Sequence, residues 1–403
     1  MRRTFTAVLT LTLCIFLVAS QAVMAAGKAD SAKDAAPVVD VVAQRMQWAE
    51  DNGLNRTESV QELYEKAKAE GQLNLYGNTG RFETVAAEFM KLYPGINVSF
   101  YDLGATEIIE KFTREYNAGI RTADVIATTE DTGNLYHDFV KTGLVHNYQP
   151  EDIFYNVIDE SWLVLTPFVL EVPWWYYNTE VYDDLPISSW WDVTLPEWKG
   201  KLIFETPPTS LIAIATAMTK EPEVMAAEYE RVFGEPITLA ADEPDAAHAW
   251  LKRVARNNPI LETSLTNLTR NVGGAPGIKN PPIGFGSSAK LRERDIQGWR
   301  LGSNPGKFQT PSTALSYIVV EIANEAPHVN AAKLFSRFLC GEADHDSKGL
   351  GVFLTAGSYP VFSDVQIAAP QPPIQSAVPF NADLDYIYEH FDDTMDYWIS
   401  VQP

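Results

Sequence analysis

Cysteine is scarce in this sequence: only two occur among 403 residues. Cys14 lies in an N-terminal segment that we expect to be cleaved off, which leaves Cys340 alone. The mature chain can then form no intramolecular disulfide, and at this length it can bury its cores without one. Cys340 ends a helical pattern, so we expect a small buried side chain there and not a nucleophile.

Basic residues are also few. Lysine and arginine number 31 against 53 acidic residues, which gives a formal net charge of −22. Nucleic acids and anionic membrane surfaces attract clustered basic residues, so this composition argues against both as partners. We expect a soluble monomer whose copies repel one another. The net charge does not define the charge of a ligand, because a recessed site has its own local charges.

Long apolar runs are absent except at residues 5–19. Arg2 and Arg3 precede that run, and small residues follow it as far as Ala26. This order is typical of a secretory signal peptide cleaved near Ala25, and it predicts a periplasmic protein. The run is too short to span a membrane comfortably.

Strand and helix patterns alternate along most of the chain. Residues 73–76 form a short strand pattern, 77–80 a turn pattern, and 82–90 carry apolar side chains at helical spacing. The same order recurs further along, which predicts an α/β fold with parallel sheets and right-handed crossovers. Residues 59–62 have the spacing of a capping box, so we expect folded structure to start near Ser59.

Catalytic patterns are few. Residues 284–289 fit the spacing of a dinucleotide fingerprint, but Pro281 and Pro282 cut the preceding strand short. The six histidines are scattered, and neither a metalloprotease pair nor a nucleophile elbow occurs. Residues 344–346, Asp-His-Asp, fit a solvated loop at a helix end better than a metal site. We therefore expect no catalytic residue, cofactor or metal, and a secreted hydrolase is the least favoured alternative.

Several local patterns follow one another in a particular order. The first is Glu70-Gly71 followed by Leu73–Gly77, and the second is Tyr93–Ile96. The third is Thr122–Ile126 followed by Lys141–Val145, and the fourth is Tyr177–Thr179 followed by Ser189–Val193 and Trp198–Leu202. The fifth is Asn330–Lys333 followed by Gly357–Val361. In this order, across about residues 70–365, the chain resembles the type 2 periplasmic solute-binding proteins of ABC transporters. The resemblance is to the branch that includes binders of ferric iron, polyamines, phosphonates and sugar phosphates.

The resemblance implies a two-lobed α/β fold with mainly parallel sheets, joined by two hinge strands that cross near residues 165–172 and 308–316. The expected division is a signal peptide (1–26), a leader (27–58), the first part of lobe 1 (59–168), lobe 2 (169–311), the return to lobe 1 (312–345) and a C-terminal segment packed on the lobes (346–403). It also implies a small-molecule ligand in a cleft between the lobes and an ABC transporter permease as partner. A ligand sensor for a membrane receptor is an alternative that the same fold supports.

The resemblance places ligand contacts at turns that face this cleft. In the first turn, 77–81, backbone N–H groups at a helix start favour an anion, and Arg81 can add a bidentate contact or can be solvated. Thr209 and Ser210 either contact the ligand or cap a helix. Trp174 and Tyr176 share a strand face and either stack on the ligand or pack in the core. The predicted ligand contacts are Asn78, Thr79, Gly80, Arg81, Thr128, Trp174, Tyr176, Thr209, Ser210, Ser287 and Ser288.

The residue types at these turns bear on the ligand. Ferric-iron binders of this branch typically use two adjacent tyrosines, often with a histidine in the first turn. Here the first turn has Asn78 and Thr79, and residues 285–288, which match the tyrosine position, are Phe-Gly-Ser-Ser. We therefore expect a small organic anion such as a sugar phosphate, a phosphonate or a carboxylate. Ferric iron and polyamines stay as alternatives.

Overall fold

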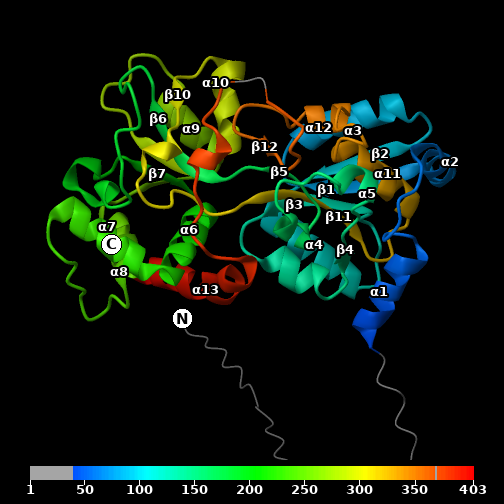
Figure 1. The fold of residues 1–403 in the computed structure, drawn as a ribbon, viewed down its shortest axis with the longest axis horizontal. Helices are drawn as coiled ribbons and strands as arrows, with labels where there is room; N and C mark the ends of the chain where they lie inside the picture. Colours follow the sequence, from blue (N-terminus) through cyan, green and yellow to red (C-terminus); the bar gives the residue numbers. More distant parts are fainter. Residues whose placement is uncertain (1–39, 368–369) are drawn as a thin grey trace, which may run out of the picture. The chain divides into compact units, whose positions relative to one another are not determined.

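Two sheets with helices packed around them organise the protein in this computed structural model, which describes residues 40–367 and 370–403 (Figure 1). The predicted signal peptide and residues 27–39 of the predicted leader lie outside the described residues. Within the described part, no helix is both long enough and apolar enough to cross a membrane.

The first sheet, with the helices around it, forms lobe 1. Its seven strands follow the order β12-β5-β11-β3-β1-β2, with β4 paired to β11. The strands are β1 (Gln72–Gly77), β2 (Asn97–Asp102), β3 (Val125–Glu130), β4 (Val145–His146), β5 (Pro167–Leu170), β11 (Tyr317–Ala323) and β12 (Tyr359–Pro360). The main helices are α2 (Val60–Glu70), α3 (Arg81–Leu92), α4 (Ala105–Asn117), α11 (Val329–Leu339), α12 (Lys348–Gly351) and the π-helix η1 (Leu135–Val140).

The second sheet and its helices form lobe 2. Its five strands follow the order β10-β6-β9-β7-β8. The strands are β6 (Pro173–Asn178), β7 (Leu202–Glu205), β8 (Ile260–Glu262), β9 (Ile283–Ser287) and β10 (Leu301–Gly302). The helices are α6 (Thr209–Lys220), α7 (Pro222–Phe233), α8 (Ala246–Arg256), α9 (Leu265–Gly273), the short helix η5 (Ser288–Leu291) and α10 (Arg292–Gln297).

Both sheets are mixed. The strand β1 is parallel to β2 and β3, and β7 is parallel to β8 and β9. The strands nearest the crossings are antiparallel: β11 pairs with β3 and β5, and β6 pairs with β9. The predicted two-lobed α/β fold is confirmed, but the expectation of mainly parallel sheets is wrong, because the strands at the crossings reverse direction.

The chain crosses between the two sheets twice. It leaves the first sheet after Leu170 and enters the second at Pro173, so Glu171 and Val172 make the outward crossing. It leaves β10 at Gly302 and rejoins the first sheet at Tyr317. The outward crossing lies within the predicted interval 165–172, and the return includes the predicted interval 308–316.

A helix precedes the start that the sequence suggested. Helix α1 (Val41–Asp51) lies against lobe 1, where Arg45 donates a hydrogen bond of 2.9 Å to the carbonyl oxygen of Thr142. No side chain of α1 is buried, so its helical pattern lacks the apolar face that marks a core helix. The predicted cap at Ser59 is confirmed, since its side chain accepts the N–H of Glu62 at 3.3 Å.

The C-terminal helix α13 (Leu384–Ser400) contacts both lobes, and it lies at the lower edge of Figure 1 between them. Toward lobe 2 it packs on α6 and α8 and buries Ile387 and Trp398, which are 4% and 3% exposed. Toward lobe 1 its contacts are polar or aromatic: Asp385 lies 2.8 Å from the Nε2 atom of His137, and Tyr388 stacks on that imidazole at 4.1 Å.

Candidate ligand-binding site

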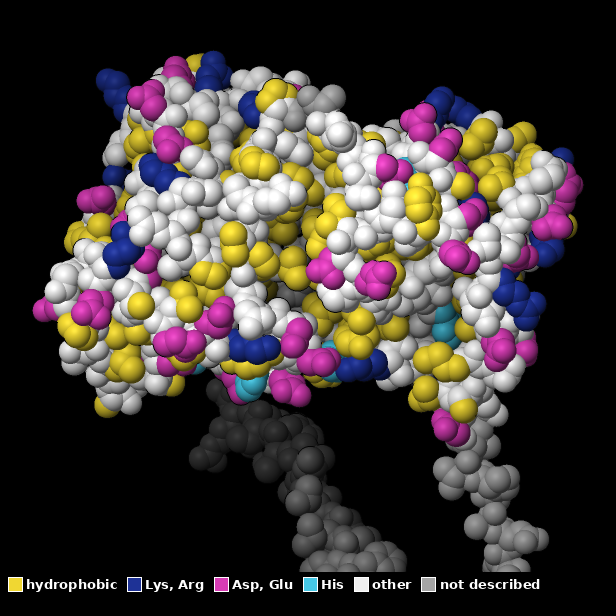
Figure 2. All heavy atoms as spheres, viewed as in Figure 1, with side chains coloured by type: hydrophobic (Ala, Val, Ile, Leu, Met, Phe, Trp, Pro, Cys, Tyr) yellow, Lys and Arg dark blue, Asp and Glu magenta, His cyan; other side chains and the backbone are white. Residues whose placement is uncertain are grey.

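A hollow separates the two halves of the molecule in Figure 2, and hydrophobic side chains border it. Several strands end in or lead to charged residues: Arg81 begins the helix after β1, Asp131 follows β3, Glu205 ends β7, and Lys290 lies in the short helix after β9. Ligands of open α/β proteins bind outside the carboxyl ends of such strands. The turns between the lobes are therefore the candidate site.

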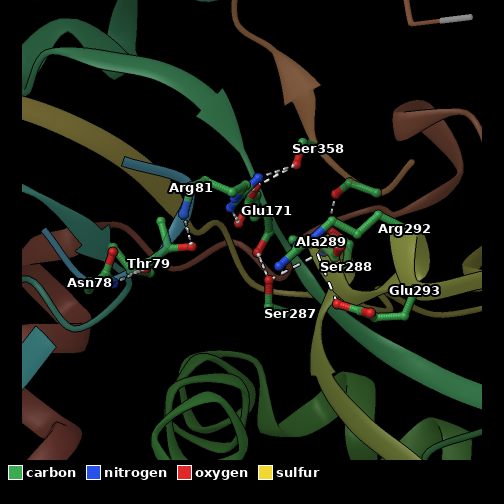
Figure 3. Close-up of polar contacts among 12 residues, drawn as sticks. Asn78, Thr79, Arg81, Glu171, Ser287, Ser288, Ala289, Arg292, Glu293 and Ser358 are labelled. Atoms are coloured by element: carbon green, nitrogen blue, oxygen red, sulfur yellow. Dashed lines mark hydrogen bonds and ion pairs between the residues drawn. The ribbon is translucent and has the colours of Figure 1, made fainter. Parts of the chain in front are cut away.

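Arg81 is held in an ion pair inside the protein. Its guanidinium lies 2.7 Å from a carboxylate oxygen of Glu171 and donates to the Ser358 hydroxyl at 3.3 Å (Figure 3). It also lies 4.1 Å from the ring centre of Phe353. Burial lowers the pKa of Arg81, and Arg292 adds to this effect, while Glu171 opposes it. The alternative of a solvated Arg81 is wrong, because the side chain is only 13% exposed.

Glu171 connects the two crossings and both lobes. Its backbone N–H donates to Ser316 on the return crossing at 3.2 Å, and its backbone oxygen accepts from the hydroxyl of Ser287 at 3.5 Å. Its carboxylate accepts from Ser358 at 2.5 Å besides holding Arg81. Figure 3 shows Arg81, Ser287 and Ser358 around this glutamate. Sequence reasoning missed Glu171, since nothing local marks a crossing residue as the partner of Arg81.

The serines after β9 differ in availability. Ser288 is fully buried, and its hydroxyl donates to the carbonyl oxygen of Gly357 at 2.5 Å. Ser287 is half-buried, and its hydroxyl accepts the N–H of Ala289 at 3.4 Å. Below them, the Tyr176 hydroxyl lies 2.7 Å and 2.8 Å from the carbonyl oxygens of the two serines. The Tyr176 hydroxyl thus fixes the backbone of this turn, and the hydroxyl of Ser287 is the more accessible of the two.

The first turn, residues 77–81, is hydrogen-bonded to the end of β3. Asn78 donates to the hydroxyl of Thr129 at 2.8 Å, and the Thr79 hydroxyl accepts the N–H of Arg81 at 3.5 Å. Gly80 has an ordinary helical φ of −57°, and a Cβ built there meets no atom within 4 Å, so nothing in the backbone demands glycine. Thr128 is 1% exposed, and its hydroxyl has no partner among the described residues.

Thr209 and Ser210 do not cap a helix. They are the first two residues of α6, the N-cap is Pro208, and no side chain bonds to the free N–H groups there. The alternative role of these residues as caps is therefore wrong. Both side chains are half-buried, and within residues 40–367 and 370–403 neither hydroxyl makes a hydrogen bond. Both remain available to a ligand.

Trp174 and Tyr176 pack in the core. Their exposed fractions are 1% and 0%, and their rings meet edge to face at 6.0 Å. Trp174 also packs against Tyr359 at 6.3 Å. Of the two roles open from the sequence, core packing is the one observed. The strand has both faces covered, so its alternating pattern of aromatic residues did not distinguish a cleft face from a core face.

Lys290 is the site's basic group without an ion pair. It is half-buried, it donates to the Thr266 hydroxyl at 2.7 Å, and among the described residues no carboxylate lies within ion-pair distance of its ammonium. Burial lowers the pKa of Lys290 to about 8; the nearby charges of Arg292 and Arg81 add to this effect, and those of Glu293 and Glu171 oppose it. Sequence reasoning stopped at Ser288, two residues earlier in the same turn.

Two carboxylates approach the site from opposite lobes. Burial raises the pKa of Asp131 to about 7, and repulsion from Glu130 and Glu205 adds to it. Burial also raises the pKa of Glu205, while Lys290 opposes that shift. Each residue lies at the carboxyl end of a strand that the sequence pattern had identified, and that position is the signal that could have found Glu205.

The described residues do not gather a metal site. Among them, no group of three or more histidine, cysteine, aspartate or glutamate side chains is arranged to hold an ion. Both ring nitrogens of His345, in the predicted helix-end loop, already have hydrogen-bond partners. Its Nδ1 atom lies 3.0 Å from Asp364, and its Nε2 atom lies 2.8 Å from the carbonyl oxygen of Ile153.

The sequence was compared with protein-family models and with curated protein sequences. Residues 76–273 match the family model described as bacterial extracellular solute-binding protein. No curated protein sequence matches the chain.

Several solved structures are similar in fold. Iron-bound HitA from Pseudomonas aeruginosa has a TM-score of 0.57 at 17% identity, covering 82% of this chain and 99% of its own. AfuA from Actinobacillus pleuropneumoniae, a periplasmic binding protein with fructose-6-phosphate bound, has 0.58 at 18%, covering 82% and 98%. The periplasmic binding protein P5PA has 0.59 at 16%, covering 83% and 100%. At these identities the likeness is one of fold, and it is the two-lobed type 2 fold that the sequence resemblance implied.

Proposed function

Because residues 76–273 match the model of the bacterial extracellular solute-binding proteins, we propose that this protein captures a small organic anion and delivers it to an ABC transporter permease. The anion lies between the lobes, near Lys290 and the Arg81–Glu171 ion pair. The observation that carries this proposal is Lys290, a half-buried ammonium that has basic neighbours and no ion pair among the described residues.

The charge balance around Lys290 supports an anion. A desolvated ammonium is costly unless an opposite charge compensates it. Glu171 is already engaged by Arg81 at 2.7 Å, and Glu293 lies 3.9 Å from Arg292. A phosphate, phosphonate or carboxylate next to Lys290 supplies the missing negative charge. The free hydroxyls of Thr209 and Ser210, at the start of α6, offer further donors.

Arg81 has a different part in this proposal. Its ion pair with Glu171 neutralises much of its charge, so it acts as a fixed donor, and its Nε atom is buried without a partner among the described residues. Arg81 belongs to lobe 1 and Lys290 to lobe 2, so an anion that contacts both joins the lobes. Joining them favours the closed form, which the permease recognises. Micromolar binding requires about −8 kcal/mol in total.

Ferric iron fits the residues less well. HitA was solved with iron bound, but here the turn after β9 has serines, and the described residues offer no group of three or more histidine, cysteine, aspartate or glutamate side chains arranged to hold an ion. Hard ferric ions require several anionic oxygens, and neutral hydroxyls are poor substitutes. Iron is therefore the ligand to exclude by experiment.

The test is a thermal-shift and calorimetric screen of residues 27–403 with sugar phosphates, phosphonates, dicarboxylates, polyamines and ferric citrate. A ligand at 100 times its Kd stabilises the folded state by about 2.7 kcal/mol. We expect stabilisation by one anionic class, and we expect Lys290→Met to lose it while Lys199→Met, an exposed lysine in the same lobe, keeps it. Stabilisation by ferric citrate alone, unaffected by Lys290→Met, contradicts the proposal.

A further inference from the structure

The ion pair between Arg81 and Glu171 uses only part of the guanidinium. The Nη2 atom of Arg81 lies 2.7 Å and 2.9 Å from the two carboxylate oxygens of Glu171. The Nη1 atom donates to the Ser358 hydroxyl at 3.3 Å, and the Nε atom is buried without a partner among the described residues. A guanidinium carries five N–H groups, so Arg81 keeps donors that Glu171 does not engage.

Arg337 shows how a purely structural arginine of lobe 1 is paired. Its Nη1 and Nη2 atoms donate to the two oxygens of Asp152 at 2.9 Å and 2.6 Å, and its Nε atom donates to Glu342 at 3.0 Å. All three nitrogens of that guanidinium contact a carboxylate, whereas in Arg81 only one does. A buried N–H without a partner is costly, so Arg81 is incompletely satisfied by the fold.

Glu171 reaches Arg81 from the outward crossing between the lobes. Its N–H donates to the carbonyl oxygen of Ser316 on the return crossing at 3.2 Å, and its own carbonyl oxygen accepts from the Ser287 hydroxyl of lobe 2 at 3.5 Å (Figure 3). Its carboxylate contacts only lobe 1 groups, Arg81 and Ser358. Crossing residues absorb the backbone change when lobes open or close. The carboxylate therefore belongs to the part of the chain that can move relative to Arg81.

The carboxylate of Glu171 has the same chemistry as the ligand of the proposed function. Carboxylate and phosphate oxygens bind the same guanidinium N–H groups. Glu171 is 4% exposed, so solvent screens its charge little. An anion that approaches Arg81 therefore meets a donor that is already engaged and a negative charge that repels it.

We propose that Glu171 is a built-in competitor of the ligand, whose carboxylate occupies the Nη2 atom of Arg81 and thereby weakens anion binding. The inference rests on the proposed function, because it adds to the same anion-binding cleft the residue that limits its affinity. A solute-binding protein has to release its ligand to the permease. A competitor attached to the crossing keeps the ligand from being held too tightly for that release.

The test replaces the competitor without changing its shape. Glu171→Gln removes the charge and keeps an oxygen that can accept from Arg81 and Ser358. Calorimetry at pH 7.5 with ethyl phosphate, methylphosphonate and propionate gives the Kd of each anion. We expect Glu171→Gln to bind at least one of them about tenfold more tightly than the parent, because a like charge next to the anion is removed. The melting temperature should fall, because a buried ion pair is broken.

A merely structural role of Glu171 predicts that affinity and melting temperature fall together. Asp152→Asn is the matched control, since it breaks the buried pair of Arg337 in the same lobe; it should lower the melting temperature and leave each Kd unchanged. Ser358→Ala is the second variant. It removes the hydroxyl that donates to Glu171 at 2.5 Å, so the competitor is easier to displace, and we expect a smaller gain in affinity.

The outcomes separate this inference from the proposed function. An anion that binds the parent and is lost in Lys290→Met, but binds Glu171→Gln no more tightly, overturns the competitor and leaves anion binding intact. If Glu171→Gln does not fold, an unchanged Kd in Ser358→Ala overturns it in the same way. An anion that binds Glu171→Gln and not the parent supports the competitor. Binding of none of the three anions to the parent or to either variant overturns both proposals.

Discussion

The buried charges of lobe 1 and the charges between the lobes are made of the same residue types but are organised differently. In lobe 1, Arg337 is 2% exposed; its guanidinium donates to both oxygens of Asp152 at 2.9 Å and 2.6 Å and to Glu342 at 3.0 Å. Between the lobes, Lys290 and Asp131 are half-buried, and neither has an ion-pair partner among the described residues. A charge that the fold has paired stabilises the fold. A charge that it leaves unpaired in a recess is free for a ligand.

The largest expected effect comes from breaking the paired set. Arg337→Met removes the cation that Asp152 and Glu342 share, and it leaves Glu342, whose pKa burial already raises, without compensation. We expect the free energy of unfolding to fall by about 3 kcal/mol, measured by urea denaturation. A loss below about 1 kcal/mol would mean that the ion pairs of Arg337 with Asp152 and Glu342 contribute no more to stability than a surface ion pair does.

A buried ionisable group of a third kind lies in β11, where Glu321 accepts hydrogen bonds from the N–H and hydroxyl of Thr166 at 2.7 Å and 3.0 Å. Burial raises its pKa to about 8. Because the folded pKa is above the unfolded one, its contribution to stability is complete below pH 4.5 and is lost as the pH rises to about 8.

Glu321→Gln removes this titration and keeps an oxygen acceptor. We expect the variant to be more stable than the parent at pH 8.5, by more than the about 1.4 kcal/mol that a single pKa unit is worth, and nearly equal at pH 5. Urea denaturation at the two pH values measures the difference. A parallel pH profile for the two proteins contradicts the shifted pKa of Glu321.

Lys290 should behave in the opposite way to Arg337. Removing an unpaired, half-buried ammonium costs the fold little, so we expect Lys290→Met to change the free energy of unfolding by less than about 0.5 kcal/mol and anion affinity by tenfold or more. Loss of stability comparable to that of Arg337→Met would place Lys290 among the paired structural charges.

The pH dependence of anion binding tests whether the charge of Lys290 contributes to binding. An anion binds the charged form of Lys290, whose pKa is about 8, so affinity should fall as the pH rises above 8, by about tenfold between pH 7.5 and 9.5. Lys290→Arg keeps its charge over this range and should flatten the profile. Calorimetry with ethyl phosphate across the pH range measures both proteins.

The smallest effect is expected at an exposed ion pair. Lys220 lies 3.4 Å from Asp383, with 31% and 68% of the two side chains exposed. Solvent screens such a pair, so Lys220→Ala should lower the free energy of unfolding by less than about 0.5 kcal/mol. A larger loss in a thermal melt would show that α13 depends on this contact for its attachment to lobe 2.

Local features of the fold could be predicted from the sequence. Ser59 and Gly71 delimit α2 through interactions within a few residues, and the observed helix has both caps. The strand predicted at residues 73–76 is observed as β1, because its periodicity is a local signal. Helix α1 was missed because it buries no side chain and so has no apolar stripe. The antiparallel strands were missed because strand direction depends on where the chain returns.

The site was predictable only as far as its location. Asn78, Thr79 and Arg81 lie at the strand ends where the resemblance placed them. That Arg81 is already paired depends on Glu171, which is 90 residues away in the sequence. Whether Lys290 or Asp131 has a partner is likewise decided by tertiary packing. Local sequence can suggest that a side chain reaches a cleft, but it cannot say whether another part of the chain has neutralised it.

The contact of α13 with lobe 1 has a practical consequence for measuring the protein in solution. It is polar and partly open to solvent, with 60% of the Asp385 side chain exposed beside His137. Cys340 is 1% exposed and burial raises its pKa, so a maleimide dye does not compete for it. In residues 27–403, the chain expected after cleavage, Asp385→Cys therefore offers a single labelling position at the junction of the lobes. The emission of an environment-sensitive dye attached there would report ligand binding if the ligand alters that junction.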